Sequence, residues 1–162
     1  MKTIILFLTS LTLFANPIDD LKLNSKKGVI KLKSFKGKTV LFVNIATRCG
    51  YTPQLTGLEK IYKKYKSKDF TVIGIPSNEF GSQSPEDDNG IEKFCMLNHG
   101  VTFPISKKTT VLGDKKNPVI KYLIVQTNNK EIRWNFEKFL LTKKGNIVRF
   151  GSTVKPESKE LI

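Results

Sequence analysis

The sequence predicts one α/β domain in which helices cover a mixed β-sheet. Two apolar runs, residues 38–46 and 70–76, are typical of buried strands. Between them, residues 55–65 carry apolar side chains at helical spacing with charged residues among them. A strand, a helix and a second strand in this order indicate an α/β protein. With 162 residues and 39% hydrophobic content, the chain can build one core but not two domains.

A β-hairpin is expected ahead of the first buried strand. Residues 18–23 and 29–32 alternate apolar and polar side chains, and Gly28 lies in the turn between them. After the second buried strand, a polar loop rich in Gly and Pro covers residues 78–88. A short helix over residues 91–98 then carries the second of the two cysteines.

The remaining chain predicts a helix, a second hairpin and a final helix. Residues 117–126 have a broad apolar face, residues 135–141 and 146–150 flank a Lys-Lys-Gly turn, and residues 156–162 form a short helix that covers the sheet. In an α/β sheet the loops after the buried strands lie at its carboxyl edge. We therefore expect the chemistry of the protein at that edge.

The first 15 residues are typical of a signal peptide, and the folded domain is expected over residues 16–162. Lys2 is a minimal basic start, an apolar stretch covers residues 3–14, and Ala15 is a small residue suited to cleavage. This stretch is too short to span a bilayer, which needs about 20 residues. A cleaved leader predicts a periplasmic or secreted protein. The alternative is an N-terminal element that is retained, in a cytoplasmic protein.

The net charge of +14 does not predict a nucleic-acid-binding protein. Only three of the 28 basic residues are arginine, and the lysines are spread along the whole chain. A basic block with interleaved aromatic residues, which nucleic-acid binding favours, is missing from the sequence. The charge instead predicts attraction of acidic partners or substrates at low salt.

Cys49 and Cys95 are the only cysteines, and Cys49 directly follows the first buried strand. Two cysteines on different elements form either a passive disulfide or a redox pair. No metal or other cofactor is expected, because His99 is the one histidine and no spacing matches a zinc motif. His99 ends the predicted Cys95 helix, which disfavours a Cys-His hydrolase. The lack of a CxxC motif disfavours a dithiol reductase of the thioredoxin type.

The most specific pattern consists of three segments, residues 44–52 (NIATRCGYT), 74–83 (GIPSNEFGSQ) and 134–140 (WNFEKFL). In this order and spacing they resemble the three signature blocks of the glutathione peroxidase family. The resemblance runs from about residue 18 to the C-terminus. It implies a thioredoxin-like fold and the reduction of hydroperoxides, both H2O2 and organic or lipid hydroperoxides.

The resemblance assigns Cys49 as the peroxidatic thiol and Gln83, Trp134 and Asn135 as its catalytic assistants. The thiolate is the nucleophile, and an unperturbed cysteine with a pKa of about 8.5 is mostly protonated at neutral pH. Hydrogen-bond donors stabilise a thiolate without a histidine. The indole N–H can only donate, whereas the two amides can donate to sulfur and orient the peroxide. The same donors can stabilise the charge on the departing oxygen.

The loop over residues 78–88 and the residue before it depart from the family pattern at two positions. Glu79 stands where glutamine is common, and Ser77 stands where cysteine or a similar small residue is common. We expect Glu79 to bring a negative charge near Cys49 and to oppose thiolate formation.

Cys95 stands where the thioredoxin-dependent members of the family have a resolving cysteine. The resemblance implies a disulfide between Cys95 and the oxidised Cys49, which a thioredoxin-like dithiol or glutathione then reduces. A disulfide needs α-carbons within about 7 Å, so we expect the Cys95 helix to unwind locally. The alternatives are a free buried Cys95, a peroxide sensor or redox relay, and a non-catalytic module with a structural disulfide.

The segment between Tyr122 and Trp134 is short and polar. Tetrameric members of the family carry a longer insertion there, so the resemblance implies a monomer. It also implies an open face over Cys49 that admits bulky hydroperoxides.

Overall fold

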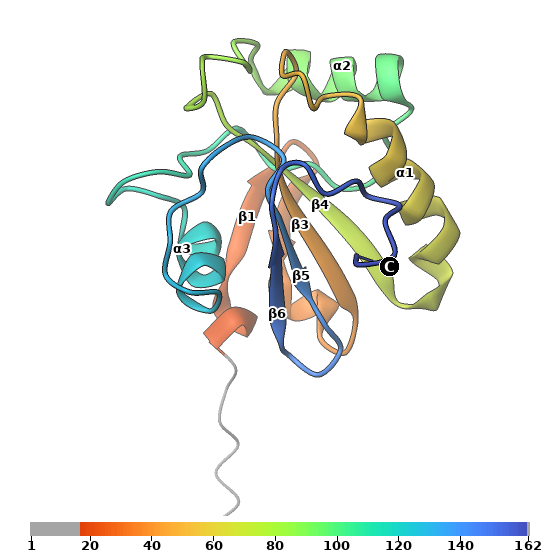
Figure 1. The fold of residues 1–162 in the computed structure, drawn as a ribbon, viewed down its shortest axis with the longest axis vertical. Coiled ribbons are helices and arrows are strands. Elements are labelled where there is room, and N and C mark those ends of the chain that lie inside the picture. The colour runs from red at the N-terminus through yellow and green to blue at the C-terminus, as the bar shows by residue number, and fades with distance from the viewer. Residues whose placement is uncertain (1–16, 162) are drawn as a thin grey trace, which may run out of the picture.

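The computed structural model describes residues 17–161, which form a four-stranded mixed sheet with helices on both faces (Figure 1). The strand order is β4-β3-β5-β6. The central strand β3 (Thr39–Ile45) pairs in parallel with β4 (Phe70–Pro76). On its other side β3 pairs antiparallel with β5 (Lys138–Leu141), which pairs antiparallel with β6 (Ile147–Phe150). The predicted mixed sheet is confirmed.

The side chains of β3 alternate between two hydrophobic cores, one on each face of the sheet. Val40 and Phe42 belong to the first core, whereas Leu41, Val43 and Ile45 belong to the second. All five are buried, as expected for a strand whose two faces are both covered.

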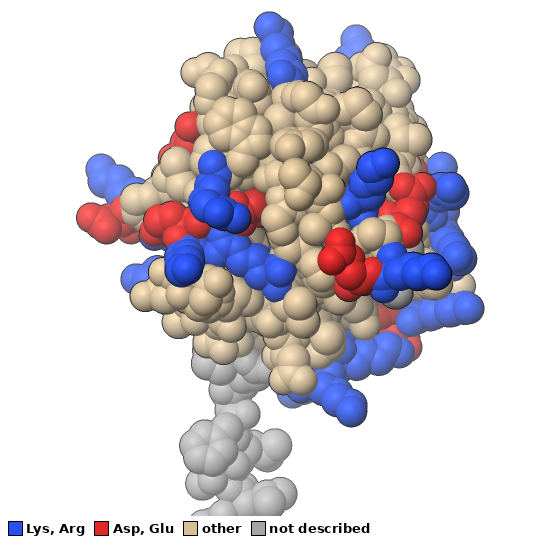
Figure 2. All heavy atoms as spheres, viewed as in Figure 1, with Lys and Arg blue, Asp and Glu red and all other residues tan. Residues whose placement is uncertain are grey.

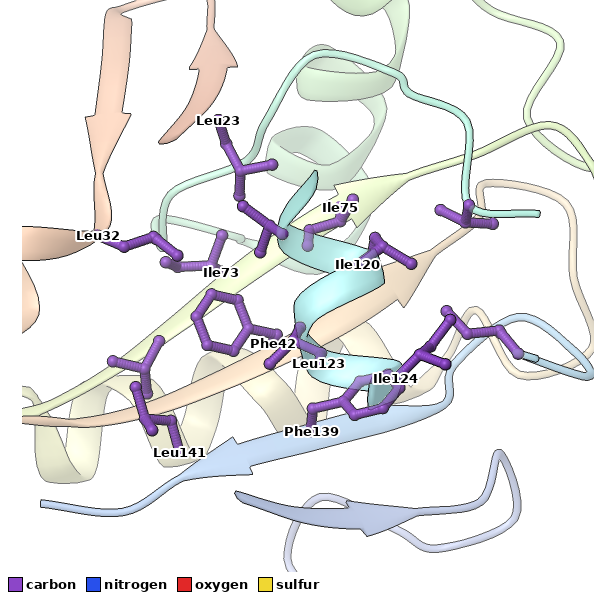
Figure 3. Close-up of a cluster of buried hydrophobic side chains, with 14 of the residues drawn as sticks. Leu23, Leu32, Phe42, Ile73, Ile75, Ile120, Leu123, Ile124, Phe139 and Leu141 are labelled. Atoms are coloured by element: carbon purple, nitrogen blue, oxygen red, sulfur yellow. The ribbon is translucent and has the colours of Figure 1, made fainter. Parts of the chain in front are cut away.

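The first core is closed by α3 (Pro118–Val125) and by the N-terminal hairpin of β1 (Lys22–Ser25) and β2 (Gly28–Lys31). Figure 3 shows Phe42 of β3 beside α3, whose residue Leu123 belongs to the same cluster. The N-terminal hairpin predicted from alternation is therefore confirmed, although its first strand begins later than expected.

The second core is closed by α1 (Gln54–Tyr65) and α2 (Asp88–His99), which lie together at one side of the sheet (Figure 1). Leu58 of α1, Cys49 and Cys95 all belong to this cluster. Both cysteines therefore lie on the same side of the sheet.

Two predicted strands begin three or four residues later than expected. Residues 17–20 form the 3-10 helix η1 (Pro17–Asp20), and β5 begins at Lys138 instead of at residue 135. Phe136 has a φ of 66°, in the left-handed region, so an extended strand cannot run through it. Two further 3-10 helices are η2 (Leu32–Phe35) and η3 (Lys66–Lys68).

The C-terminal helix predicted over residues 156–162 is wrong for the described part, residues 156–161. This segment forms successive turns, with bonds from Ser158 N–H to Lys155 O and from Leu161 N–H to Ser158 O. A segment this short does not offset the free energy of helix nucleation. Leu161 is nevertheless buried in the second core, so the segment does cover that side of the sheet.

The predicted signal peptide, residues 1–15, lies outside the described residues. Within residues 17–161 no helix has the length and apolar character needed to cross a membrane. On the face in Figure 2, Lys and Arg side chains lie among Asp and Glu side chains and do not gather in one block.

Phe42→Ala is expected to lower the free energy of unfolding by about 3–5 kcal/mol, because it leaves a cavity at the centre of the first core. Phe42 is 1% exposed. Urea unfolding followed by circular dichroism measures the change. Val148→Ala, at a residue on β6 that is 44% exposed, is the control and should stay within about 0.5 kcal/mol of wild type. Equal losses in the two variants would contradict the assignment of Phe42 to the core.

Candidate active site

Cys49 lies in the turn that connects β3 to α1, and it is 6% exposed. Thr52 holds this turn, because its hydroxyl accepts from the Cys49 N–H at 3.0 Å and donates to the Ala46 carbonyl at 2.9 Å. The Tyr51 N–H donates to the Cys49 Sγ at 3.4 Å. A backbone donor in this place stabilises a negatively charged sulfur.

The loop after β4 is fastened to the Cys49 turn through Gln83. The Gln83 carbonyl accepts from the Thr47 N–H at 3.1 Å and from the Arg48 N–H at 2.9 Å. The two residues before Gln83 turn the chain through left-handed conformations, with φ values of 61° at Gly81 and 52° at Ser82. The loops after the two parallel strands therefore meet at the carboxyl edge of the sheet, as predicted.

Gln83 also meets the segment that precedes β5. The Asn135 Nδ2 donates to Gln83 Oε1 at 3.0 Å, and Asn135 is fully buried. Trp134 is 40% exposed, and its ring centroid lies 5.9 Å from that of Phe80. Asn44 of β3 donates from Nδ2 to the Trp134 carbonyl at 3.1 Å, which anchors this segment to the central strand.

Gln83 is thus bonded to the Cys49 turn. The segment of Trp134 and Asn135 is bonded to β3, the strand that precedes this turn. Within residues 17–161, none of these three side chains hydrogen-bonds to Cys49 Sγ, whereas the Tyr51 N–H does. The hydrogen bond between the Gln83 and Asn135 side chains fixes the direction of both amides.

Glu86 ties the Cys49 turn to the segment in front of α2, and sequence reasoning missed it. Its carboxylate accepts from the Thr47 hydroxyl at 2.6 Å and from two Arg48 guanidinium nitrogens at 2.9 and 2.8 Å. Burial raises the pKa of Glu86, but hydrogen bonds from Thr47, the backbone and Arg48, together with the Arg48 charge, outweigh it and hold the pKa below its ordinary value. The one signal in the sequence was an acidic residue beside Pro85 in a polar loop.

Cys95 faces the second core from α2 and is fully buried. Burial raises the pKa of its thiol to about 12, and the charges of Glu86 and Glu92 add to this effect. The Asp87 carboxylate caps the helix by accepting a backbone N–H at 2.7 Å. Both Cys49 and Cys95 are free thiols. Cys95 is therefore protonated and shielded as long as the helix stays formed.

A sequence model described as glutathione peroxidase matches residues 18–124. The chain belongs to the glutathione peroxidase family. Glutathione peroxidase-like peroxiredoxin 2 of Saccharomyces cerevisiae is 49% identical over 145 residues, which cover 86% of this chain and 90% of the relative. Glutathione peroxidase homolog BsaA of Staphylococcus aureus is 42% identical over 144 residues, which cover 86% of this chain and 91% of the relative. The chain is thus a peroxidase, an enzyme of the oxidoreductase class.

Solved structures agree with this family and fold. The crystal structure of Trgpx in its apo form has a TM-score of 0.69 and 36% identity, and the match covers 88% of this chain and 90% of that one. T. cruzi GPX1 has a TM-score of 0.66 and 30% identity, with 89% and 90% covered. A thioredoxin-family thiol:disulfide interchange protein of Chlorobium tepidum, 19% identical with a TM-score of 0.58 and 85% and 88% covered, shares the fold. The thioredoxin-like fold is confirmed.

The structure places the Glu79 carboxylate on the backbone of another loop. Its Oε2 accepts hydrogen bonds from the backbone N–H groups of Val111 and Leu112, in the loop before α3. Val111 and Leu112 pack with the first core, whereas Cys49 belongs to the second, on the other face of the sheet. The Glu79 carboxylate therefore anchors the loop before α3, and its effect on the Cys49 thiolate stays a prediction.

His99 ends α2, as predicted, but it is partly buried. Its Nδ1 lies 3.0 Å from the Thr56 hydroxyl, and its ring is tilted against that of Phe94 with centroids 5.6 Å apart. Burial lowers the pKa of His99, which favours the neutral imidazole. In the part of the chain that the structure describes, no three His, Cys, Asp or Glu side chains are grouped so that they could hold a metal ion.

Proposed function

We propose that this protein reduces hydrogen peroxide and organic or lipid hydroperoxides with Cys49 as the nucleophile and Gln83, Trp134 and Asn135 as donors. The observation that carries the proposal is the hydrogen bond from Asn135 Nδ2 to Gln83 Oε1, because it joins two remote segments beside the Cys49 turn. The family match and the relatives named glutathione peroxidase-like peroxiredoxins support the same reaction.

In the first step the Cys49 thiolate attacks one peroxide oxygen and forms an S–O bond. The O–O bond breaks, and its electron pair leaves on the second oxygen as hydroxide or alkoxide, which takes up a proton to become water or an alcohol. The sulfur is thereby oxidised to a sulfenic acid. The Tyr51 N–H stabilises the thiolate, and the Trp134 indole and the two amides donate to the departing oxygen.

In the second step Cys95 attacks the sulfur of the sulfenic acid, a disulfide forms and water leaves. Cys95 is fully buried, so α2 must first open locally and expose its thiol. A thioredoxin-like dithiol or glutathione then reduces the disulfide and restores both thiols. The polar segment before Trp134 is short, and Trp134 is 40% exposed, which supports a monomer whose site admits bulky substrates.

Asn135→Ala is expected to slow the oxidation of Cys49 by H2O2 by about 10²-fold, because one donor to the developing charge is lost. Stopped-flow fluorescence of the reduced protein measures this rate, with Trp134, the one tryptophan, as the reporter.

The matched control is Asn146→Ala, which removes an exposed amide in the turn between β5 and β6. This control should oxidise at the wild-type rate. If Asn135→Ala folds and also oxidises at the wild-type rate, Asn135 does not assist the reaction.

A further inference from the structure

Lys138, the first residue of β5, is a fully buried lysine that the proposed reaction does not use. It lies in the middle of the sheet, between Val43 of β3 and Phe150 of β6. Lysine is almost never fully buried unless it is paired. Among the described residues, no carboxylate lies within ion-pair distance of its ammonium group, and the neighbouring Glu137 binds Arg149 instead.

The partner of Lys138 is a backbone carbonyl next to the active site. Its Nζ donates to the Phe136 carbonyl at 2.8 Å, and this bond is buried. Burial lowers the pKa of Lys138 to about 8, and the Glu137 charge opposes this effect. At pH 7 the side chain is thus still largely an ammonium group, which forms a stronger hydrogen bond to the carbonyl than a neutral amine would.

Phe136 directly follows Asn135 and holds an unfavourable backbone conformation. Its φ of 66° is left-handed, which costs a bulky residue free energy and persists only where its surroundings enforce it. Its N–H donates to the Asn44 carbonyl at 2.7 Å, and its carbonyl accepts from Lys138. The N–H and the carbonyl of Phe136 are therefore both held by residues of the sheet, Asn44 of β3 and Lys138 of β5.

The same turn places both donor residues. Asn44 of β3 binds the Trp134 carbonyl as well as the Phe136 N–H, so the chain is held on each side of Asn135. Without the bond from Lys138, Phe136 keeps only one of these two backbone hydrogen bonds, the one to Asn44. The backbone can then relax toward an extended conformation, which would turn Asn135 away from Gln83.

We infer that Lys138 is a positioning residue of the peroxidase site, which acts through the Phe136 turn to hold Trp134 and Asn135 in place. This inference rests on the proposed function, because it assigns the lysine to the geometry of the same donors. A lysine that only filled space could be replaced by an unbranched apolar side chain without an effect on the reaction.

The test compares Lys138→Met, which keeps an unbranched side chain but removes the donor, with Lys138→Arg, which keeps a cationic donor. Lys143→Met, at an exposed lysine in the β5–β6 turn, is the matched control. Three quantities are measured: the rate of Cys49 oxidation by H2O2, the rate of Cys49 alkylation by iodoacetamide, and the emission maximum of Trp134.

In Lys138→Met, oxidation is expected to slow by about 10–100-fold, since misplaced catalytic groups cost up to about 10²-fold. Alkylation needs only the thiolate and should change by less than about twofold. The Trp134 emission should shift, and Lys138→Arg should recover most of the oxidation rate. A purely structural role would slow both reactions together or leave both unchanged.

Wild-type oxidation in folded Lys138→Met would overturn the inference, as would equal losses in oxidation and alkylation. If Lys138→Met does not fold, Lys138→Leu, which also has no hydrogen-bond donor, is measured in the same way and judged by the same criteria. Cys49→Ser is run beside them. An active Cys49→Ser would refute the proposed function itself, whereas an inactive one beside a fully active Lys138→Met would refute the role of Lys138 alone.

Discussion

Cys49→Ser is expected to reduce peroxide consumption to the background rate. A serine hydroxyl does not ionise at neutral pH, so the variant has no nucleophile to attack the peroxide, and loss of a nucleophile costs about 10⁶-fold in well-studied enzymes. Steady-state peroxide consumption with a thioredoxin-like dithiol or glutathione measures the effect. The side chain is 6% exposed and the exchange changes its volume little, so the unfolding transition should stay close to that of wild type.

Thr153→Ala, at an exposed hydroxyl in the C-terminal segment, serves as the control and should keep full activity. More than a tenth of the wild-type rate in Cys49→Ser would mean that another group reduces the peroxide.

Cys95→Ser is expected to leave the first oxidation of Cys49 intact and to abolish recycling by a dithiol. With one equivalent of peroxide the reduced protein should stop at the sulfenic acid, because no internal thiol captures it. Excess peroxide oxidises this sulfenic acid further without any recycling. The fully buried thiol, with a pKa raised to about 12, stays unreactive until α2 opens, so its loss should not affect the first step. Single-turnover and multiple-turnover assays separate the two effects.

Met96→Ser provides the comparison for Cys95→Ser, since it changes the adjacent residue of the same helix, which is 53% exposed. This variant should recycle normally. If Cys95→Ser also recycles at the wild-type rate with a dithiol, Cys95 is a buried core residue and the reductant acts directly on Cys49.

Much of the fold followed from hydrophobic patterning. The strand over residues 70–76 was predicted with its observed bounds, and β3 was predicted to within one residue at each end. These strands are covered on both faces, so nearly every residue in them is apolar and the signal is strong. The segment over residues 156–161 carried a weaker signal, because a few apolar residues near a proline fit turns as well as a helix.

The polar contacts of the site could not be predicted in the same way. The position of Cys49 at a strand end followed from the apolar run before it, and the signature blocks named Gln83 and Asn135. Where the Glu79 side chain points depends on the backbone donors that it can reach. These donors, Val111 and Leu112, lie more than thirty residues later in the chain. Lys138 begins an apolar strand, and hydrophobic patterning alone predicts that a lysine there faces solvent. In the structure it is fully buried.

The contact between Arg48 and Glu86 is a further polar contact that the sequence does not predict. The sequence alone assigns no partner to Arg48. In the structure its guanidinium binds the Glu86 carboxylate, which also accepts from Thr47. The bond depends on how the loop in front of α2 folds back over the Cys49 turn, and no local pattern encodes that path.

The most direct test of the proposed Cys49–Cys95 cycle is the mass of the reduced wild-type protein after one equivalent of H2O2, with peptide mapping of the two cysteines. This cycle predicts the loss of two hydrogen atoms, a peptide that joins Cys49 to Cys95, and the release of two water molecules per peroxide. A protein that keeps both thiols, or that gains oxygen at a methionine while Cys49 stays reduced, would contradict it.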